Sequence, residues 1–284
     1  MIFKAPDRLA AFHDRAIAQD IPADDVERWL AIARPCATLV LNENGPVVGR
    51  LGGPLLLPED TPDPAHPLVA SIDLAALPSG VTDLPLPADG HLLLFAYPDE
   101  DMDDNSDNLG SVVHVPAGAT VVEREERVGL EYDPYRGTTR HIPQGPLVAV
   151  ADMSLPYHHL ARFPEKPRIR HLPGHPRAEE LVDAWDAICR DVDIWGSLQI
   201  GGYSNQEAVG TDPVADAVPA ALREVEKSRM DGPVSSDVAD WVLLADWHLD
   251  IAGLEGASVH WSIQREDLAE WRFDRVITTM FWNP

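Results

Sequence analysis

Short apolar runs separated by turns rich in proline and glycine are the feature of this sequence that most limits its fold. Runs of four to eight apolar residues bounded by turn residues are typical of buried strands. The run at 36–41 is followed by the turn Asn44-Gly45-Pro46 and a second run at 47–51, which predicts a hairpin over 36–51. Other strands are predicted at 68–74, 91–97, 111–115, 120–123, 128–132, 146–153, 241–249, 258–263 and 275–282.

Helical periodicity is confined to a few segments. Two helices are predicted within residues 1–35. The clearest helix is 177–190, whose Trp185 we expect to be buried against the C-terminal sheet. A more polar helix is predicted at 213–227 and a short one at 265–271. Because strands and helices do not alternate strictly, the predicted class is α+β, with mixed, mainly antiparallel sheets and a few packed helices.

A proline-rich segment at 163–176 divides the chain of 284 residues. We therefore expect an N-terminal helical segment (1–35), a first α+β lobe (36–162), the link (163–176) and a second α+β lobe (177–284). A chain of this length is near the limit of a single core, so the two lobes are predicted to share one.

The net charge limits the partners of the protein. The chain has 22 basic and 47 acidic residues, a net charge of −25. Such a surface repels phosphate backbones and anionic lipids, which argues against nucleic-acid and membrane binding. It favours electrostatic capture of a basic protein partner.

Several features indicate the cytoplasm. The first residues lack the pattern of a signal peptide, and no stretch approaches the ~20 apolar residues of a membrane span. Cys36 and Cys189 are far apart and lie among apolar residues, which predicts two buried free thiols in a reducing compartment.

The common catalytic and cofactor motifs are missing from the sequence. It has no phosphate-binding loop, no dinucleotide fingerprint and no zincin motif, so no cofactor is predicted. Residues 202–206 resemble a nucleophile elbow around Ser204, but Gln206 stands where the second glycine belongs. We therefore predict no catalytic residue.

Two groups of residues are weak metal candidates. One is an alternating acidic loop, in which Ser106 replaces the glycine that a calcium loop requires, so a mobile loop without a bound ion is expected. Its oxygen ligands would be Asp101, Asp103, Asn105 and Asp107. The other group is formed by the histidines in and around the link, His158, His159, His171 and His175.

Paired glycines at 52–53 and 201–202 carry the ligand-binding hypothesis. Glycine pairs at strand ends let the backbone approach a ligand closely, although they also serve simply to turn the chain. We predict that both turns border one cleft, with arginine and tyrosine as polar contacts and a tryptophan as its wall. The candidate residues are Arg50, Gly52, Gly53, Gly202, Tyr203, Gln206 and Trp247.

Several segments, in order along the chain, resemble the YwqG-like family, DUF1963. They are RLGGPLLLP (50–58), PLVASIDL (67–74), LPADGHLLLF (86–95), IGGY (200–203), WVLLAD (241–246) and the closing strand and helix from 256 to 268. The resemblance implies a bacterial, cytoplasmic α+β protein of unknown activity, and some relatives sit near toxin and immunity genes. Ser71 and Ala245 replace two glutamines expected in the family, which puts any polar site shared with it in doubt.

Three functions follow from these observations. The first is a non-enzymatic cytoplasmic binding or interaction protein, associated with toxin immunity if the resemblance extends that far. The second is a metal-dependent hydrolase that uses the acidic loop or the histidines. The third is a small-molecule or peptide binder with an aromatic cleft in the C-terminal lobe, where seven of the eight tryptophans lie.

Overall fold

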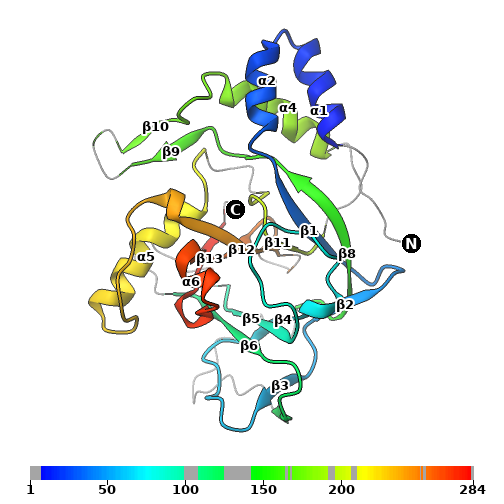
Figure 1. The fold of residues 1–284 in the computed structure, drawn as a ribbon, viewed down its shortest axis with the longest axis vertical. Helices are drawn as coiled ribbons and strands as arrows, with labels where there is room; N and C mark the ends of the chain where they lie inside the picture. The colour runs from blue at the N-terminus through cyan, green and yellow to red at the C-terminus, as the bar shows by residue number, and fades with distance from the viewer. Residues whose placement is uncertain are drawn as a thin grey trace.

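The computed structural model describes residues 8–98, 108–124, 142–163, 166, 168–190, 196–205, 210–249, 251 and 254–282. In these residues the chain forms a ten-stranded sheet, two small sheets and five α-helices (Figure 1). Every pair of named strands is antiparallel. Antiparallel sheets together with separate helices confirm the predicted α+β class. The helices are α1 (Arg8–Ala18), α2 (Ala23–Leu30), α4 (Ala178–Arg190), α5 (Val214–Glu226) and α6 (Arg265–Ala269).

The large sheet has the strand order β14-β13-β12-β11-β1-β8-β2-β4-β5-β6. Its strands are β1 (Arg34–Leu41), β2 (Val47–Leu51), β4 (Leu68–Asp73), β5 (His91–Ala96), β6 (Gly110–Val115), β8 (Gly145–Ser154), β11 (Leu198–Ile200), β12 (Trp241–His248), β13 (Ser258–Gln264) and β14 (Ile277–Phe281). One small sheet pairs β3 (Leu55–Pro58) with β7 (Val121–Arg124), and the other pairs β9 (Leu160–Arg162) with β10 (Ile169–His171).

The large sheet curls until its two ends nearly meet. The backbone N–H of Leu109, just before β6, donates to the carbonyl of Thr278 in β14 at 3.1 Å. The N–H of Thr278 donates to Asn108 Oδ1 at 2.8 Å. The main core fills the curl with residues from before and after the proline-rich segment, including Leu92 and Trp261. Strands of both predicted lobes thus contribute to one sheet and one core.

The predicted hairpin over 36–51 is wrong, because β8 lies between β1 and β2. Leu41 of β1 pairs with Leu147 of β8, and Leu51 of β2 pairs with Gly145 on the other edge of the same strand. The ten residues of β8 are long enough to serve both neighbours. Apolar runs and a turn predict that two strands exist, but they do not specify that the strands pair with each other.

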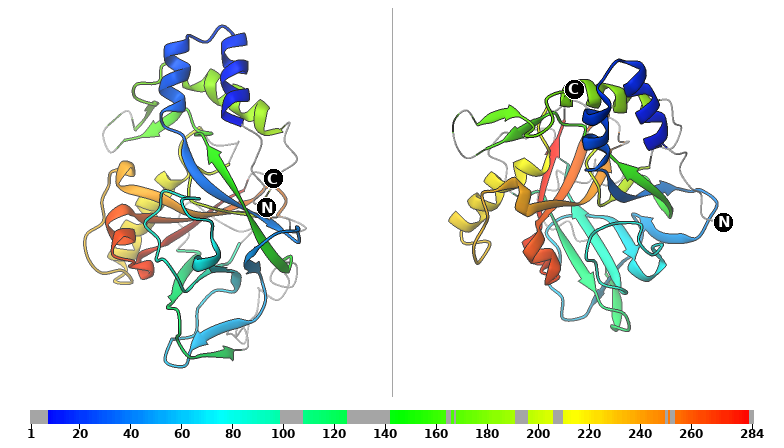
Figure 2. Two further views of the ribbon diagram at one scale, coloured as in Figure 1. Left: turned by 45° about the vertical axis from the view of Figure 1, so that its right-hand side comes forward. Right: turned by 45° about the horizontal axis from the view of Figure 1, so that its top comes forward.

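The three helices α1, α2 and α4 form a separate small core above the sheet (Figure 2). Trp185 is 1% exposed, as expected, but its ring meets Phe12 of α1 edge-on at 6.0 Å between centroids. Arg8 covers the same ring and pairs with Asp152 of β8. The expected packing of Trp185 against the C-terminal sheet is therefore wrong, because the N-terminal helices supply its partners.

Two more elements frame the site described below. Helix α5 packs its alanine- and valine-rich face on Trp241, Leu243 and Ile277 of the sheet. The proline-rich segment contains β10, which turns back on β9 to form a hairpin that projects from the body of the molecule (Figure 1). Both cysteines are free and buried, as predicted. Among the described residues, no helix is long and apolar enough to cross a membrane.

Candidate functional site

The turn after β11 holds Tyr203 in a fixed position. Gly201 and Gly202 have φ of +71° and +75°, a region that costs glycine little and other residues more. The Gln199 side chain closes the turn, since its Nε2 donates to the carbonyls of Gly201 and Tyr203, both at 2.8 Å. The N–H of Tyr203 donates to Ser154 Oγ at 2.9 Å. The backbone of the turn is therefore held by buried side chains on both sides.

A buried carboxylate anchors the next residues of this turn. Asp246 of β12 is fully buried, with His260 Nδ1 2.9 Å from its Oδ1, and its Oδ2 accepts from the N–H of Asn205 at 3.2 Å. Burial alone would raise the pKa of the Asp246 carboxyl. The nearby His260 and His248, with hydrogen bonds from His260 and Ser204, outweigh burial and lower the pKa to about 2. The carboxylate is thus ionised at neutral pH.

Tyr203 and Gly202 line a cavity of about 740 Å³. The cavity lies between the start of β1, the β9–β10 hairpin, the N-terminal part of α5, the segment before β12 and the start of α6. Its apolar wall includes Leu160, Phe163, Leu172, Val214, Trp241 and Leu243. Its charged and ionisable side chains are Arg34, Arg162, Arg265, His158, His175, Asp212 and Asp237.

Two arginines of this cavity form no ion pair in the described part of the chain, although Asp83 and Asp240 attract Arg265 from a longer distance. The Arg34 guanidinium carbon stacks 4.4 Å from the centroid of the Tyr203 ring, whose hydroxyl donates to the carbonyl of Ile32 at 3.0 Å. Arg265 uses its Nε to donate to the carbonyl of Ala239 at 3.0 Å. Burial lowers the pKa of Arg265, and repulsion by Arg34 lowers it further. The two cations are therefore close enough to disfavour each other.

The remaining charges of the cavity are engaged. Asp212 accepts from the N–H of Val214 at 3.0 Å and lies 3.9 Å from His158 Nε2. Asp237 accepts from the N–H of Ala239 at 3.0 Å. Arg162 pairs with Asp216 at 3.0 Å. Burial lowers the pKa of His158 by more than the nearby Asp212 raises it. The lowered pKa favours a neutral imidazole. Arg34 and Arg265 are thus the arginines of the cavity that form no ion pair within the described chain, while Asp212 and Asp237 keep their negative charges.

The register of the sheet separates the two glycine turns. Leu51, before Gly52, pairs with Gly145 of β8, whereas Ile200, before Gly201, lies at the level of Ala151 through Ala37 of β1. The six residue steps from Gly145 to Ala151 span about 20 Å along β8. After Leu51 and after Ile200 the backbone continues in opposite directions, which moves the two glycine turns further apart. The two turns do not border one cleft, so that part of the prediction is wrong.

The other candidate residues are dispersed. Trp247 is 1% exposed within the main core and does not line the cavity, so the prediction that it forms a wall is wrong. Arg50 is exposed, and its side chain packs over Gly53, where an added Cβ would lie 2.5 Å from Arg50 Cδ. Its role in binding stays a prediction. Gln206 and the acidic-loop residues Asp101, Asp103, Asn105 and Asp107 lie outside the described residues.

Arg34 and Arg265, the arginines of the cavity without an ion pair in the described chain, were not predicted from the sequence. Arg34 stands between a predicted helix and a predicted strand, and Arg265 begins a short predicted helix. Each is an ordinary arginine in its local sequence. The available signal was indirect, because basic residues are scarce in this chain.

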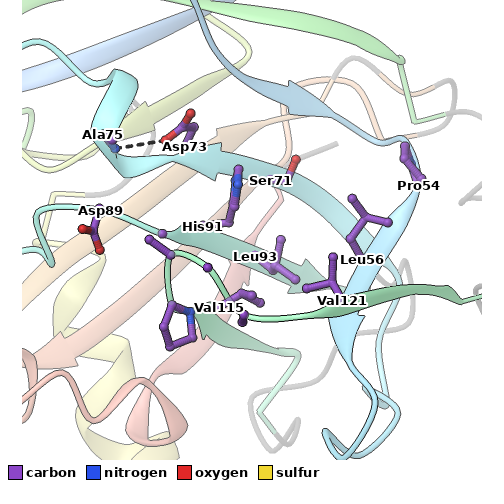
Figure 3. A pocket seen from close by; sticks show the side chains of 15 residues that line it. Pro54, Leu56, Ser71, Asp73, Ala75, Asp89, His91, Leu93, Val115 and Val121 are labelled. Carbon is purple, nitrogen blue, oxygen red and sulfur yellow. Dashed lines mark hydrogen bonds between the residues drawn. The ribbon is translucent and has the colours of Figure 1, made fainter.

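A second cavity, of about 350 Å³, lies between the β3–β7 sheet and the outer face of the large sheet (Figure 3). Leu56, Leu93 and Val121 provide apolar walls, and Asp73 and Asp89 lie at one end. Oδ1 of Asp73 accepts from the N–H of Ala75 at 3.0 Å. This cavity is apolar with an acidic end, and it contains none of the candidate ligand-binding residues.

Metal binding finds no support in the part of the chain that the structure describes. No group of three or more His, Cys, Asp or Glu side chains there is arranged to hold a metal ion. His158 and His175 both line the larger cavity, but they are not part of such a group. Binding by the acidic loop stays a prediction.

The fold and the cavity define an α+β protein with one curled antiparallel sheet and, beside its β11 turn, a cavity that holds two arginines without ion pairs in the described chain. The family model of DUF1963, described as a domain of unknown function, matches residues 49–281. The chain therefore belongs to the DUF1963 family, and the resemblance drawn from the sequence is confirmed on this point. Among curated proteins, none is similar enough to match.

Proposed function

We propose that this DUF1963 protein is a non-enzymatic binding protein whose 740 Å³ cavity takes a ligand with an anionic group and an apolar body. One observation carries the proposal. Arg34 and Arg265 face the same cavity, and in the described chain no carboxylate lies within ion-pairing distance of either. The two arginines are among only 22 basic residues in a chain whose net charge is −25.

The arrangement of the two arginines suits an anion. Unpaired like charges held close together are unfavourable, and an oxyanion between them removes the repulsion. The Tyr203 ring supports Arg34 from one side, and the Ala239 carbonyl engages only the Nε of Arg265. The Nη groups remain to donate to a carboxylate or a phosphate, whose planar or bidentate pairing with guanidinium is strong. The apolar wall fits the rest of the ligand.

The wider setting of this function belongs to the same proposal. A bacterial, cytoplasmic location and an association with toxin immunity are what the resemblance implies. Free, buried Cys36 and Cys189 agree with a reducing compartment. The absence of a recognised catalytic motif in the sequence supports binding without catalysis.

The proposal is tested by titration calorimetry with phenyl phosphate, which joins an oxyanion to an apolar ring. We expect binding that weakens about 10- to 100-fold in Arg34→Gln and in Arg265→Gln, because a charge-assisted hydrogen bond contributes about 1.5–3 kcal/mol. The matched control is Arg50→Gln, an exposed arginine outside the cavity, which should bind as the wild type does.

Four results would count against the proposal. If phenyl phosphate does not bind, or binds equally to all three variants, the cavity does not recognise anions. If only Arg50→Gln weakens binding, the site lies at the turn after β2, as the sequence analysis predicted for Arg50. Release of phenol by the purified protein would favour the hydrolase alternative.

A further inference from the structure

The segment that forms one wall of the cavity reverses the charge of the chain. Residues 159–177 contain five Lys or Arg residues and one acidic residue, whereas acidic residues exceed basic ones about twofold in the whole chain. Within this segment, β9 and β10 pair as a projecting hairpin, here called the basic hairpin and described by residues 160–163, 166 and 168–171 (Figure 1). Lys166, Arg168 and Arg170 of the basic hairpin are exposed.

The outer edge of β10 is free in the described chain. β9 is covered on its other side, where the N–H groups of His159 and Leu160 donate to the carbonyl of Gly210 at 3.1 and 2.7 Å. Among the described residues, β9 is the only strand that pairs with β10, and all three residues of β10 are exposed. An unpaired edge of this kind can receive another strand.

The hydrogen bonds of the basic hairpin show which backbone groups point outward. The N–H of Phe163 donates to the carbonyl of Arg168 at 2.7 Å, and the N–H of Leu172 donates to that of His159 at 3.0 Å. Bonded and non-bonded pairs alternate in an antiparallel ladder, so Ile169 falls in a non-bonded pair. Its N–H and carbonyl therefore face away from β9, toward the free edge.

The basic hairpin is continuous with the cavity. Arg162 and Phe163 at the end of β9, and Leu172 just after β10, all line it. The Arg170 guanidinium stacks on the Phe163 ring, with 4.0 Å between its carbon and the ring centroid. A strand added to β10 would thus run past arginines and reach the cavity at Leu172.

We propose that the anionic ligand of the cavity is an acidic polypeptide segment that adds to β10 as a third strand and places a carboxylate on Arg34 and Arg265. The inference rests on the proposed function, since it names the class of ligand for the same cavity. Charged edge strands commonly prevent pairing with other chains. Here the edge charges are positive, so they repel basic strands and attract acidic ones, and the backbone edge then supplies hydrogen bonds that a small anion does not use.

The experiment uses fluorescence anisotropy with a labelled peptide of alternating glutamate and valine, beside the same peptide with glutamine for glutamate. We expect the acidic peptide to bind at least tenfold more tightly, and its affinity to fall with added salt. Ile169→Pro removes an outward N–H without removing a hydrogen bond to β9, and it should weaken peptide binding at least tenfold. Its control, Ile169→Thr, keeps that N–H and should stay within about twofold of the wild type.

Phenyl phosphate separates this inference from the proposed function. Both Ile169 variants should bind it as the wild type does, whereas Arg34→Gln should weaken both ligands. If phenyl phosphate depends on Arg34 but the acidic peptide fails to bind, or binds Ile169→Pro as tightly as Ile169→Thr, the inference is overturned and the proposed function stands. If phenyl phosphate does not bind at all, both fall.

A second variant covers the case in which Ile169→Pro disturbs the fold, as judged by thermal unfolding. Arg168→Glu combined with Arg170→Glu changes only exposed side chains. It should abolish the preference for the acidic peptide over its glutamine counterpart. An unchanged preference in this double variant overturns the inference.

Discussion

A single methyl group at Gly202 tests how tightly the turn that presents Tyr203 is built. Gly202 has φ of +75°, and a Cβ there would lie 2.4 Å from Ser154 Oγ and 2.8 Å from Cys36 Cβ. Gly118 offers a matched control, with φ of +78° and no heavy atom within 4 Å of an added Cβ. The pair separates the backbone cost of an alanine from its packing cost.

The expected magnitudes follow from these contacts. An alanine in the left-handed region costs about 1–2 kcal/mol, and this cost applies at both positions. At Gly202, overpacking adds about 1–3 kcal/mol, because Cys36 Cβ is fixed to its backbone in β1. Displacing Ser154 also weakens its hydrogen bond from the N–H of Tyr203, at about 1 kcal/mol. We therefore expect a loss of about 3–6 kcal/mol for Gly202→Ala and about 1–2 kcal/mol for Gly118→Ala.

Urea unfolding followed by tryptophan fluorescence measures both variants. Equal slopes against urea concentration allow the free energies of unfolding to be compared directly. If the two variants differ by less than about 0.5 kcal/mol, the turn yields to the methyl group and the reasoning from close packing is refuted. A folded Gly202→Ala protein should also bind phenyl phosphate more weakly, since the turn supports the Tyr203 ring beneath Arg34.

Three further predictions concern stability and reactivity. Trp185→Ala should lower the free energy of unfolding by about 3–5 kcal/mol, and a loss below about 1 kcal/mol would show that its helix core is not tightly packed. The pKa of Asp246 falls from 3.8 to about 2 on folding, so its ionised carboxylate adds about 2 kcal/mol to the free energy of unfolding above pH 4. This stabilisation is lost as the pH falls through 2. The stability difference between the wild type and Asp246→Asn should shrink accordingly in acid, and a constant difference contradicts this. Burial raises the pKa of the Cys36 thiol to about 12 and also that of Cys189, so neither should react with a thiol reagent at pH 8 before urea unfolds the chain, and rapid labelling of the native protein would disprove it.

Local pattern was enough to predict most elements of this fold. The predicted helix at 177–190 corresponds to α4, because its apolar residues follow a helical period. The predicted strand at 241–249 corresponds to β12, which is a mostly apolar run buried along nearly its whole length. β11 has only three residues and shows no period at all, so it was missed. Strand pairing is not local, and the insertion of β8 between β1 and β2 therefore had no signal in residues 36–51.

Because strand pairing is not local, only one of the two glycine turns predicted to border one cleft, the turn at 201–202, lies at the cavity. A glycine with positive φ is a local requirement, and both glycine pairs do turn the chain. β2 and β11 are three places apart in an all-antiparallel sheet, so they run in opposite directions and their ends lie at opposite edges. The arginines that share the cavity with Tyr203 come instead from the start of β1 and the start of α6. A turn can therefore be predicted from its own residues. Which other residues share a site with that turn depends on the direction of every strand that lies between the two.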